Sequence, residues 1–224
     1  MAERLHGSPE RSRSRAVYHL AFIRNCHRWL AAGYELLDAG SFSNAEEPAI
    51  TGELVRAMKE TRLRMDAPTW MIRMYVADDP PVNAAGRSGK QRRRIDIEFE
   101  RSERGARFNF HCEAKRLYRS DSVVEYLGNN GLGMFLAGEY ARDEDVGGML
   151  GYVQRDGAPE WTSRLAAALA NGRAKYSVTS DGTYDLAALV PKLQTHRSRH
   201  ERPAVGRPIL IFHTLLVFAS SDST

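Results

Sequence analysis

Two short segments alternate apolar and polar residues with a period of two, and they constrain the fold more than any other part of the chain. The apolar faces hold Ile95, Ile97 and Phe99 in residues 94–99, and Phe108, Phe110, Cys112 and Ala114 in residues 108–115. The opposite faces hold Asp96 and Glu98 in the first segment, and His111, Glu113 and Lys115 in the second. Such alternation predicts two half-buried strands. A polar turn over residues 101–105, which contains glycine, predicts that they form a β-hairpin.

The predicted hairpin gathers charged residues on one surface. Pairing across the turn places Asp96 near position 111, and therefore diagonal to Glu113. Diagonal neighbours on one face of a sheet lie roughly 7–8 Å apart. Carboxylates and a lysine are costly to collect on a half-buried face unless they pair or bind ions. The pattern therefore indicates a site for a divalent metal and a phosphate.

The length and composition set the outer limits of the interpretation. A chain of 224 residues with 42% hydrophobic residues predicts one domain over residues 16–224, preceded by a flexible, arginine-rich segment at residues 1–15. No apolar run approaches the roughly 20 residues that cross a bilayer, and the first residues do not resemble a secretory signal. Two cysteines give no disulfide framework. We therefore expect a cytoplasmic protein that does not associate with membranes.

The positive charge is clustered although the net charge is only +4. Lysines and arginines gather in residues 87–94, 115–119 and 192–207. Basic clusters beside a carboxylate site suit a polyanionic substrate such as nucleic acid. The alternative is that each cluster is an ordinary solvated surface.

The remaining pattern predicts the other elements. We expect helices over residues 16–37, 46–64, 122–140 and 161–170, and strands over residues 70–76, 147–153 and 208–218. Asn44, three residues before Glu47, predicts an N-terminal cap for the second helix. Residues 78–89 are expected to form a loop because they contain two prolines and two glycines. A hairpin followed by helix, strand and helix predicts an α/β domain with a central mixed β-sheet flanked by helices.

At this point the residues resemble a known superfamily. Asp96 in RIDIEF, followed by Glu113 and Lys115 in HCEAKRL and preceded by an acidic helix, is similar to the motif of the PD-(D/E)xK, restriction-endonuclease-like nucleases. The wider stretches 113–153 and 196–218 resemble uncharacterised nucleases and antiviral defence effectors of prokaryotes. Ile95 stands where the motif has proline. The resemblance implies a restriction-endonuclease-like core and a magnesium-dependent nuclease acting on DNA.

The chemistry of phosphodiester hydrolysis assigns a role to each residue. Mg²⁺ or Mn²⁺ prefers oxygen ligands, so Asp96, Glu113 and the carbonyl of Ala114 are the expected metal ligands. Lys115 would orient or deprotonate the attacking water, or offset charge in the transition state. It projects on the same face as Glu113 because it follows two residues later on a strand.

The fourth residue of the site is less constrained by the sequence. Many members of the superfamily add a glutamate from the helix before the sheet, and Glu47 is the first choice here. Glu46 and Glu53 are alternatives, and Glu98 is a possible ligand of a second metal ion.

Two other sites are disfavoured. His196 and His200 have the spacing of one helical face, but no Cys-x-x-Cys motif accompanies them and Cys112 points to the core, so a zinc site is not expected. Arg199, His200 and Arg202 are interpreted as surface or phosphate-contacting residues. The glycines at 128, 131 and 133 lack the Gly-Lys-Ser/Thr ending of a phosphate-binding loop and predict a break in the helix.

The residues and the resemblance together predict a metal-dependent endonuclease that acts as the effector subunit of a bacterial defence system against phages or plasmids. A sensor or ATPase subunit is an expected partner, and a homo-oligomer would supply the two active sites needed to cut both strands. The alternative is a catalytically silent subunit of the same fold that binds nucleic acid or holds a complex together.

Overall fold

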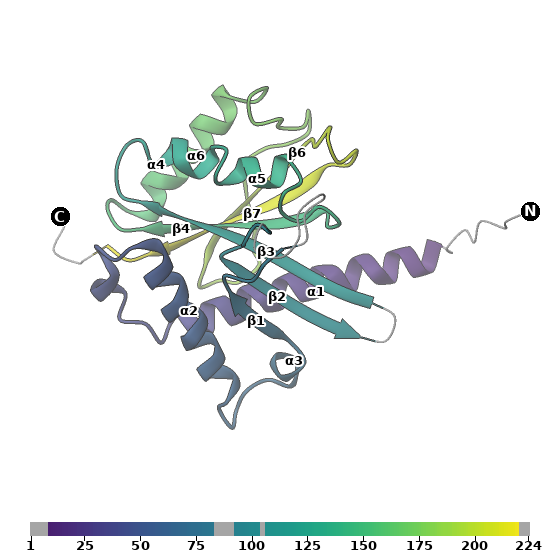
Figure 1. Ribbon diagram of the computed structural model, residues 1–224, viewed down its shortest axis with the longest axis vertical. Helices are drawn as coiled ribbons and strands as arrows, with labels where there is room; N and C mark the ends of the chain where they lie inside the picture. Colours follow the sequence, from purple (N-terminus) through teal and green to yellow (C-terminus); the bar gives the residue numbers. More distant parts are fainter. Residues whose placement is uncertain (1–8, 83–91, 104–105, 220–224) are drawn as a thin grey trace, which may run out of the picture.

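A mixed β-sheet organises the chain (Figure 1). A computed structural model describes residues 9–82, 92–103 and 106–219, and within these residues the sheet has seven strands in the order β1-β2-β3-β4-β7-β6-β5. The strands are β1 (Tyr75–Asp78), β2 (Ile97–Glu103), β3 (Ala106–Leu117), β4 (Val146–Val153), β5 (Asp185–Leu186), β6 (Gln194–His200) and β7 (Ile209–Val217). The β3-β4 and β4-β7 pairs are parallel, and the other pairs are antiparallel.

Helices cover both faces of the sheet. They are α1 (Pro9–Tyr34), the 3₁₀ helix η1 (Ala39–Phe42), α2 (Glu47–Arg62), α3 (Thr69–Ile72), α4 (Ser122–Leu127), α5 (Leu132–Leu136) and α6 (Ala158–Asn171). One buried cluster lies between the sheet and α1 and α2, and a second lies between the sheet and α4, α5 and α6. Figure 1 shows the two helical layers on opposite sides of the sheet. The prediction of an α/β domain with a mixed central sheet flanked by helices is confirmed.

None of the helices that the structure describes combines the length and the apolar character needed to cross a bilayer. The longest of them, α1, carries charged residues along its length.

The hairpin is present, but its register differs from the prediction. Strand β2 runs to Glu103 and β3 begins at Ala106, so Glu98 lies opposite His111 and Ile97 lies opposite Cys112. The predicted register, with Asp96 near position 111, is therefore wrong by two residues, because the strands continue closer to the turn than the polar residues suggested. A shift of two residues keeps the side chains paired between β2 and β3 on their predicted faces, since side chains alternate with a period of two. Residues 104–105 lie outside the described part of the chain.

Several predicted elements have different limits. Residues 70–76, predicted as one strand, divide into α3 and β1, because Pro68 caps a helical turn in which Met71 N–H donates to the Pro68 carbonyl. Residues 122–140 form two short helices, since the chain folds back where the N–H groups of Gly131 and Gly133 both donate to the Gly128 carbonyl.

The ends of the first two helices also differ from expectation. Helix α1 begins at Pro9, inside the segment predicted to be flexible, and ends at Tyr34. The cap residue of α2 is Glu46 and makes no capping hydrogen bond with its side chain, so the predicted Asn44 cap is wrong. A proline in the first turn and the acidic Glu47 there favour the start of the helix instead. Part of the predicted loop at residues 78–89 lies outside the described residues.

Strand β4 is buried on both faces, as a central parallel strand must be, and its glycines permit close packing. A Cβ atom at Gly148 would lie 2.6 Å from Cys112 Sγ and 2.8 Å from Phe110 Cζ. We expect Gly148→Ala to lower the free energy of unfolding by about 1–3 kcal/mol, because the core must shift to admit the methyl group. Urea unfolding measures this change.

The matched control is Gly52→Ala in α2, where a Cβ would meet nothing within 4 Å. Alanine is the better helix former by roughly 0.5–1 kcal/mol, so this variant should be at least as stable as the wild type. A stability loss as large as that of Gly148→Ala would contradict the packing explanation.

Candidate active site

Strand β3 carries the two residues at the centre of the site. Cys112 and Ala114 point into the core beneath α1 and α2, so Glu113 and Lys115 point to the opposite face, as predicted. Glu113 is buried and only 6% exposed. Lys115 Nζ donates to Glu113 Oε1 at 2.8 Å and to the Ala114 carbonyl at 2.6 Å. The alternation of β3 therefore brings a carboxylate and an ammonium group into direct contact inside the protein.

Asp96 occupies a bend immediately before β2. The backbone pairing between β2 and β3 begins only at Ile97. The Asp96 side chain bonds to β3 instead, because its carboxylate accepts a hydrogen bond from Ala114 N–H at 2.7 Å. The Asp96 carbonyl accepts from Asp79 N–H. The bend also carries Ile95 into the core beneath α4, α5 and α6, whereas Ile97 lies in the other core. The prediction that Ile95 and Ile97 share one face is therefore wrong, because the bend at Asp96 interrupts the strand between them.

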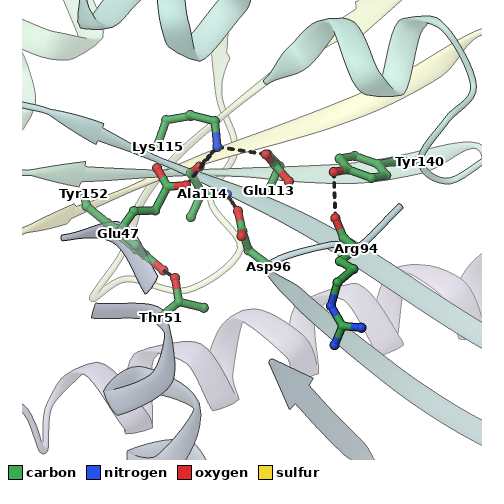
Figure 2. Close-up of polar contacts among 9 residues, drawn as sticks. All are labelled: Glu47, Thr51, Arg94, Asp96, Glu113, Ala114, Lys115, Tyr140 and Tyr152. Atoms are coloured by element: carbon green, nitrogen blue, oxygen red, sulfur yellow. Dashed lines mark hydrogen bonds and ion pairs between the residues drawn. The ribbon is translucent and has the colours of Figure 1, made fainter. Parts of the chain in front are cut away.

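Helix α2 supplies the fourth residue from its first turn. Glu47 Oε1 accepts from Lys115 Nζ at 3.0 Å. The two alternatives lie elsewhere: Glu46 pairs with Arg116, and Glu53 pairs with Arg56 on the exposed side of the helix. The structure thus brings together Glu47, Asp96, Glu113 and Lys115, which we call the carboxylate–lysine cluster (Figure 2).

Glu98 and His111 belong to a neighbouring polar pocket. His111 Nε2 lies 3.4 Å from Glu98 Oε1, and this contact lowers the pKa of Glu98. Both line a pocket of about 280 Å³ with Asn109, Arg92 and Arg142. Glu98 therefore interacts with His111 and not with the carboxylate–lysine cluster.

Two tyrosines support the cluster in ways that the sequence did not indicate. The Tyr140 hydroxyl donates to the Arg94 carbonyl at 2.7 Å and so holds the chain before Asp96. Burial, followed by the nearby charges of Glu113 and Asp96, raises the pKa of Tyr140, which keeps its proton. Tyr152 in β4 lies 2.9 Å from Thr51 Oγ1 and ties α2 to the sheet. Figure 2 shows both tyrosines beside the cluster. The polar role of Tyr140 depends on a tertiary contact with Arg94, 46 residues earlier in the chain.

The cluster contains more negative than positive groups. Burial raises the pKa of Glu113 to about 8, and the charge of Asp96 adds to the effect. Burial also raises the pKa of Asp96 and of Glu47. For Lys115, burial alone would lower the pKa, but Glu113 and Glu47 outweigh burial and raise it. Three carboxyl groups thus share one ammonium group, and an additional cation would lower the energy of the ionised site.

The donor set fits a magnesium or manganese ion. Nowhere in residues 9–82, 92–103 and 106–219 do three His, Cys, Asp or Glu side chains converge as a ready-made metal site. Mg²⁺ does not need three, because it keeps several waters and binds through one or two carboxylates. Asp96, Glu113 and the Ala114 carbonyl would hold it. Lys115 Nζ contacts the Ala114 carbonyl in this structure, so binding there requires the ammonium group to release that oxygen.

The predicted histidine pair lies on a strand and not on a helix. His196 and His200 belong to β6. His200 Nδ1 lies 2.7 Å from the Tyr176 carbonyl, which can only accept, so the neutral ring accepts at Nε2 from the Ser198 hydroxyl at 2.6 Å. The Ser198 oxygen in turn accepts from His213 Nε2 at 2.7 Å. Hydrogen bonds therefore occupy both ring nitrogens of His200. His196 differs, because among the described residues its buried Nδ1 has no hydrogen-bond partner and its ring stacks on that of Tyr184 with the centroids 4.8 Å apart.

The basic residues are less available to a polyanion than the sequence indicated. Arg202 is buried and donates to the carbonyls of Ala141 and Glu144, and His200 is fully buried, so the interpretation of both as surface or phosphate-contacting residues is wrong. Arg119 pairs with Asp121 and Glu125. Buried arginine requires such carbonyl partners because its charge cannot be removed. Residues 87–91 of the first cluster lie outside the described residues.

Comparisons with protein-family models, with curated proteins and with solved structures found no match.

Proposed function

We propose that this protein is a metal-dependent nuclease that hydrolyses phosphodiester bonds in DNA. The carboxylate–lysine cluster carries the proposal: Lys115 Nζ contacts Glu113 at 2.8 Å and Glu47 at 3.0 Å, while Asp96 accepts from Ala114 N–H. Buried acids around one lysine are a typical arrangement at functional sites, where environments shift pKa values. The resemblance to PD-(D/E)xK nucleases supports the same assignment and implies a restriction-endonuclease-like core.

Each residue has a role that follows from its surroundings. Asp96, Glu113 and the Ala114 carbonyl would hold a divalent cation, which when bound would supply stabilisation of charge on the phosphoryl oxygens. The raised pKa of Lys115 keeps its ammonium group protonated, so we assign Lys115 to stabilising negative charge and not to removing a proton. Glu47 positions this ammonium group through the contact at 3.0 Å.

The biological setting is part of the proposal and rests on the resemblance. It is that of a cytoplasmic effector subunit in bacterial defence against phages or plasmids, recruited by a sensor or ATPase subunit. Cleavage of both strands requires two active sites, which a homo-oligomer would provide.

A second candidate function follows from one observation. The Lys115 ammonium group already has three acceptors within the protein, so the cluster is complete as a structural ion-pair network. A catalytically silent subunit that binds nucleic acid or holds a defence complex together is therefore the competing proposal.

Cleavage of supercoiled plasmid by the purified full-length chain tests the proposed function. We expect nicked and linear products with Mg²⁺ or Mn²⁺ and none with excess chelator. Asp96→Asn should lower the rate by roughly 100-fold or more, because it removes the negative charge while its amide oxygen can still accept from Ala114 N–H.

The matched control is Glu53→Gln, which removes an exposed carboxylate of α2 that pairs with Arg56. It should cleave at the wild-type rate. Cleavage by Asp96→Asn at the wild-type rate would contradict the assignment of the carboxylate–lysine cluster as the active site. Tight DNA binding without cleavage, with metal supplied, would favour the silent subunit.

A further inference from the structure

A recess of about 570 Å³ opens directly beside the carboxylate–lysine cluster. Lys115 forms part of its wall, together with Val124 of α4, the loop between α4 and α5, and Lys175 beyond α6. Its volume falls within the roughly 300–1,000 Å³ of sites that enclose small organic groups. Lys115 belongs both to the recess and to the carboxylate–lysine cluster. A group held in the recess therefore lies next to the position proposed for the reacting phosphate.

The wall of the recess has the chemistry of a nucleotide site. Val124 is 60% exposed and presents an apolar surface, and unpaired bases in protein pockets are packed against aromatic or apolar side chains. Asn129 and Asn130 are exposed on the loop that lines the recess. Their amides both donate and accept hydrogen bonds, as the edge of a base requires.

The charges around the recess favour an anion on one side. Among the described residues, no carboxylate lies within ion-pairing distance of Lys175, whose ammonium group lies 5.1 Å from the centre of the Tyr176 ring. Glu125 also lines the recess, but Arg119 pairs with it. Lys175 is thus a cation whose charge remains available to a phosphate.

A concave recess of this kind separates two forms of DNA. A base in a duplex is stacked and paired, and it must be extruded before it can enter a pocket, at a cost of a few kcal/mol. An unpaired base avoids most of this cost. We propose that the recess holds one unpaired nucleotide next to the scissile phosphate, so that single-stranded DNA is the preferred substrate. The position next to a scissile phosphate rests on the proposed nuclease function, whereas the preference for binding unpaired DNA does not require catalysis.

The test measures binding without cleavage. Fluorescence anisotropy of the full-length chain, with chelator present, compares a labelled single-stranded oligonucleotide with a hairpin duplex of the same sequence. We expect the single strand to bind at least about tenfold more tightly. Val124→Glu should weaken single-strand binding by about tenfold, because it places a negative charge on the apolar wall.

Leu63→Glu is the matched control. Leu63 is 83% exposed at the end of α2, so the substitution adds the same negative charge outside the recess. It should change single-strand affinity less than threefold, the effect expected of net charge alone. Equal or tighter duplex binding, equal effects of the two variants, or no binding of either DNA would overturn the inference. If the protein preferred single strands but cleaved neither DNA, the proposed nucleotide binding in the recess would be supported and the proposed nuclease activity would be contradicted.

Discussion

Replacing Lys115 with methionine is expected to lower the rate of metal-dependent cleavage by about 100- to 10,000-fold, the range that positioned charges and proton-handling groups contribute to catalysis. Methionine keeps most of the length and the apolar stem but removes the ammonium group. That group is the cation among the carboxyl groups of Glu113, Glu47 and Asp96. Its loss removes the positive charge that we assign to the transition state.

The same substitution should change stability in a pH-dependent way. The folded pKa of Glu113 is about 8, above its ordinary value of 4.5. Between pH 4.5 and about pH 8 the native state therefore binds more protons than the unfolded state, and the free energy of unfolding falls as pH rises through this range. Lys115 lowers the pKa of Glu113, so in Lys115→Met the loss should extend to higher pH. Urea unfolding of the wild type and of Lys115→Met at pH 6 and pH 9 measures this difference in stability, and a cleavage assay of the same two proteins measures the effect on rate.

Lys192→Met is the matched control for both measurements. Lys192 pairs with Glu35, but its side chain is 68% exposed, and an exposed pair contributes roughly 0–1 kcal/mol. This variant should cleave normally and keep the wild-type pH dependence. If Lys115→Met cleaved as fast as Lys192→Met, Lys115 would be a structural residue of an ion-pair network.

The sequence predicted the centre of the site because a strand has a simple period. Alternation placed Glu113 and Lys115 on one face and Cys112 in the core, and an error of two residues in the register did not disturb that assignment. Local geometry was enough there because the two residues lie within one strand. Glu47 was only the first choice beside Glu46 and Glu53, and its tertiary contact with Lys115 distinguishes it from them.

The features that the sequence did not reveal depend on contacts between distant elements. The bend at Asp96 separates Ile95 from Ile97, and it is held by bonds to Ala114 and Asp79. Arg202 is buried because carbonyls some 60 residues away accept its hydrogen bonds. The spacing of His196 and His200 fits one face of a helix or of a strand equally well, so periodicity alone did not distinguish them.

Acidification from pH 7 to pH 4 is expected to remove several kcal/mol of stability through buried neutral histidines. Burial lowers the pKa of His27 and of His200 from 6.5 to about 4. Burial, with the nearby His200 and His196, lowers the pKa of His213 further. Between pH 6.5 and pH 4 the unfolded chain binds protons that the native state does not, so stability falls as pH falls.

The size of this effect follows from the shift. A difference of one pKa unit corresponds to about 1.36 kcal/mol, so His27 and His200 each contribute about 3 kcal/mol by pH 4. Domains have a total stability of only about 5–15 kcal/mol, so the histidine contribution is a large part of it. The raised pKa of Glu113 acts in the opposite direction between pH 8 and pH 4.5, so the histidine contribution is isolated by comparing variants. Guanidinium unfolding at pH 7, 5.5 and 4.5 follows the change.

His27→Phe isolates one of these groups. The His27 ring lies 5.5 Å from the ring of Phe110 and 5.6 Å from that of Phe212, so an aromatic replacement suits its surroundings. The variant should lose less stability than the wild type between pH 6.5 and pH 4, by about 3 kcal/mol over the whole interval. Phe22→Leu, a substitution in the same core without a titratable group, should lower stability equally at every pH. If His27→Phe and the wild type lost the same stability on acidification, His27 would not be the neutral, buried group that its hydrogen bond to the Ile23 carbonyl and its enclosure between two aromatic rings imply.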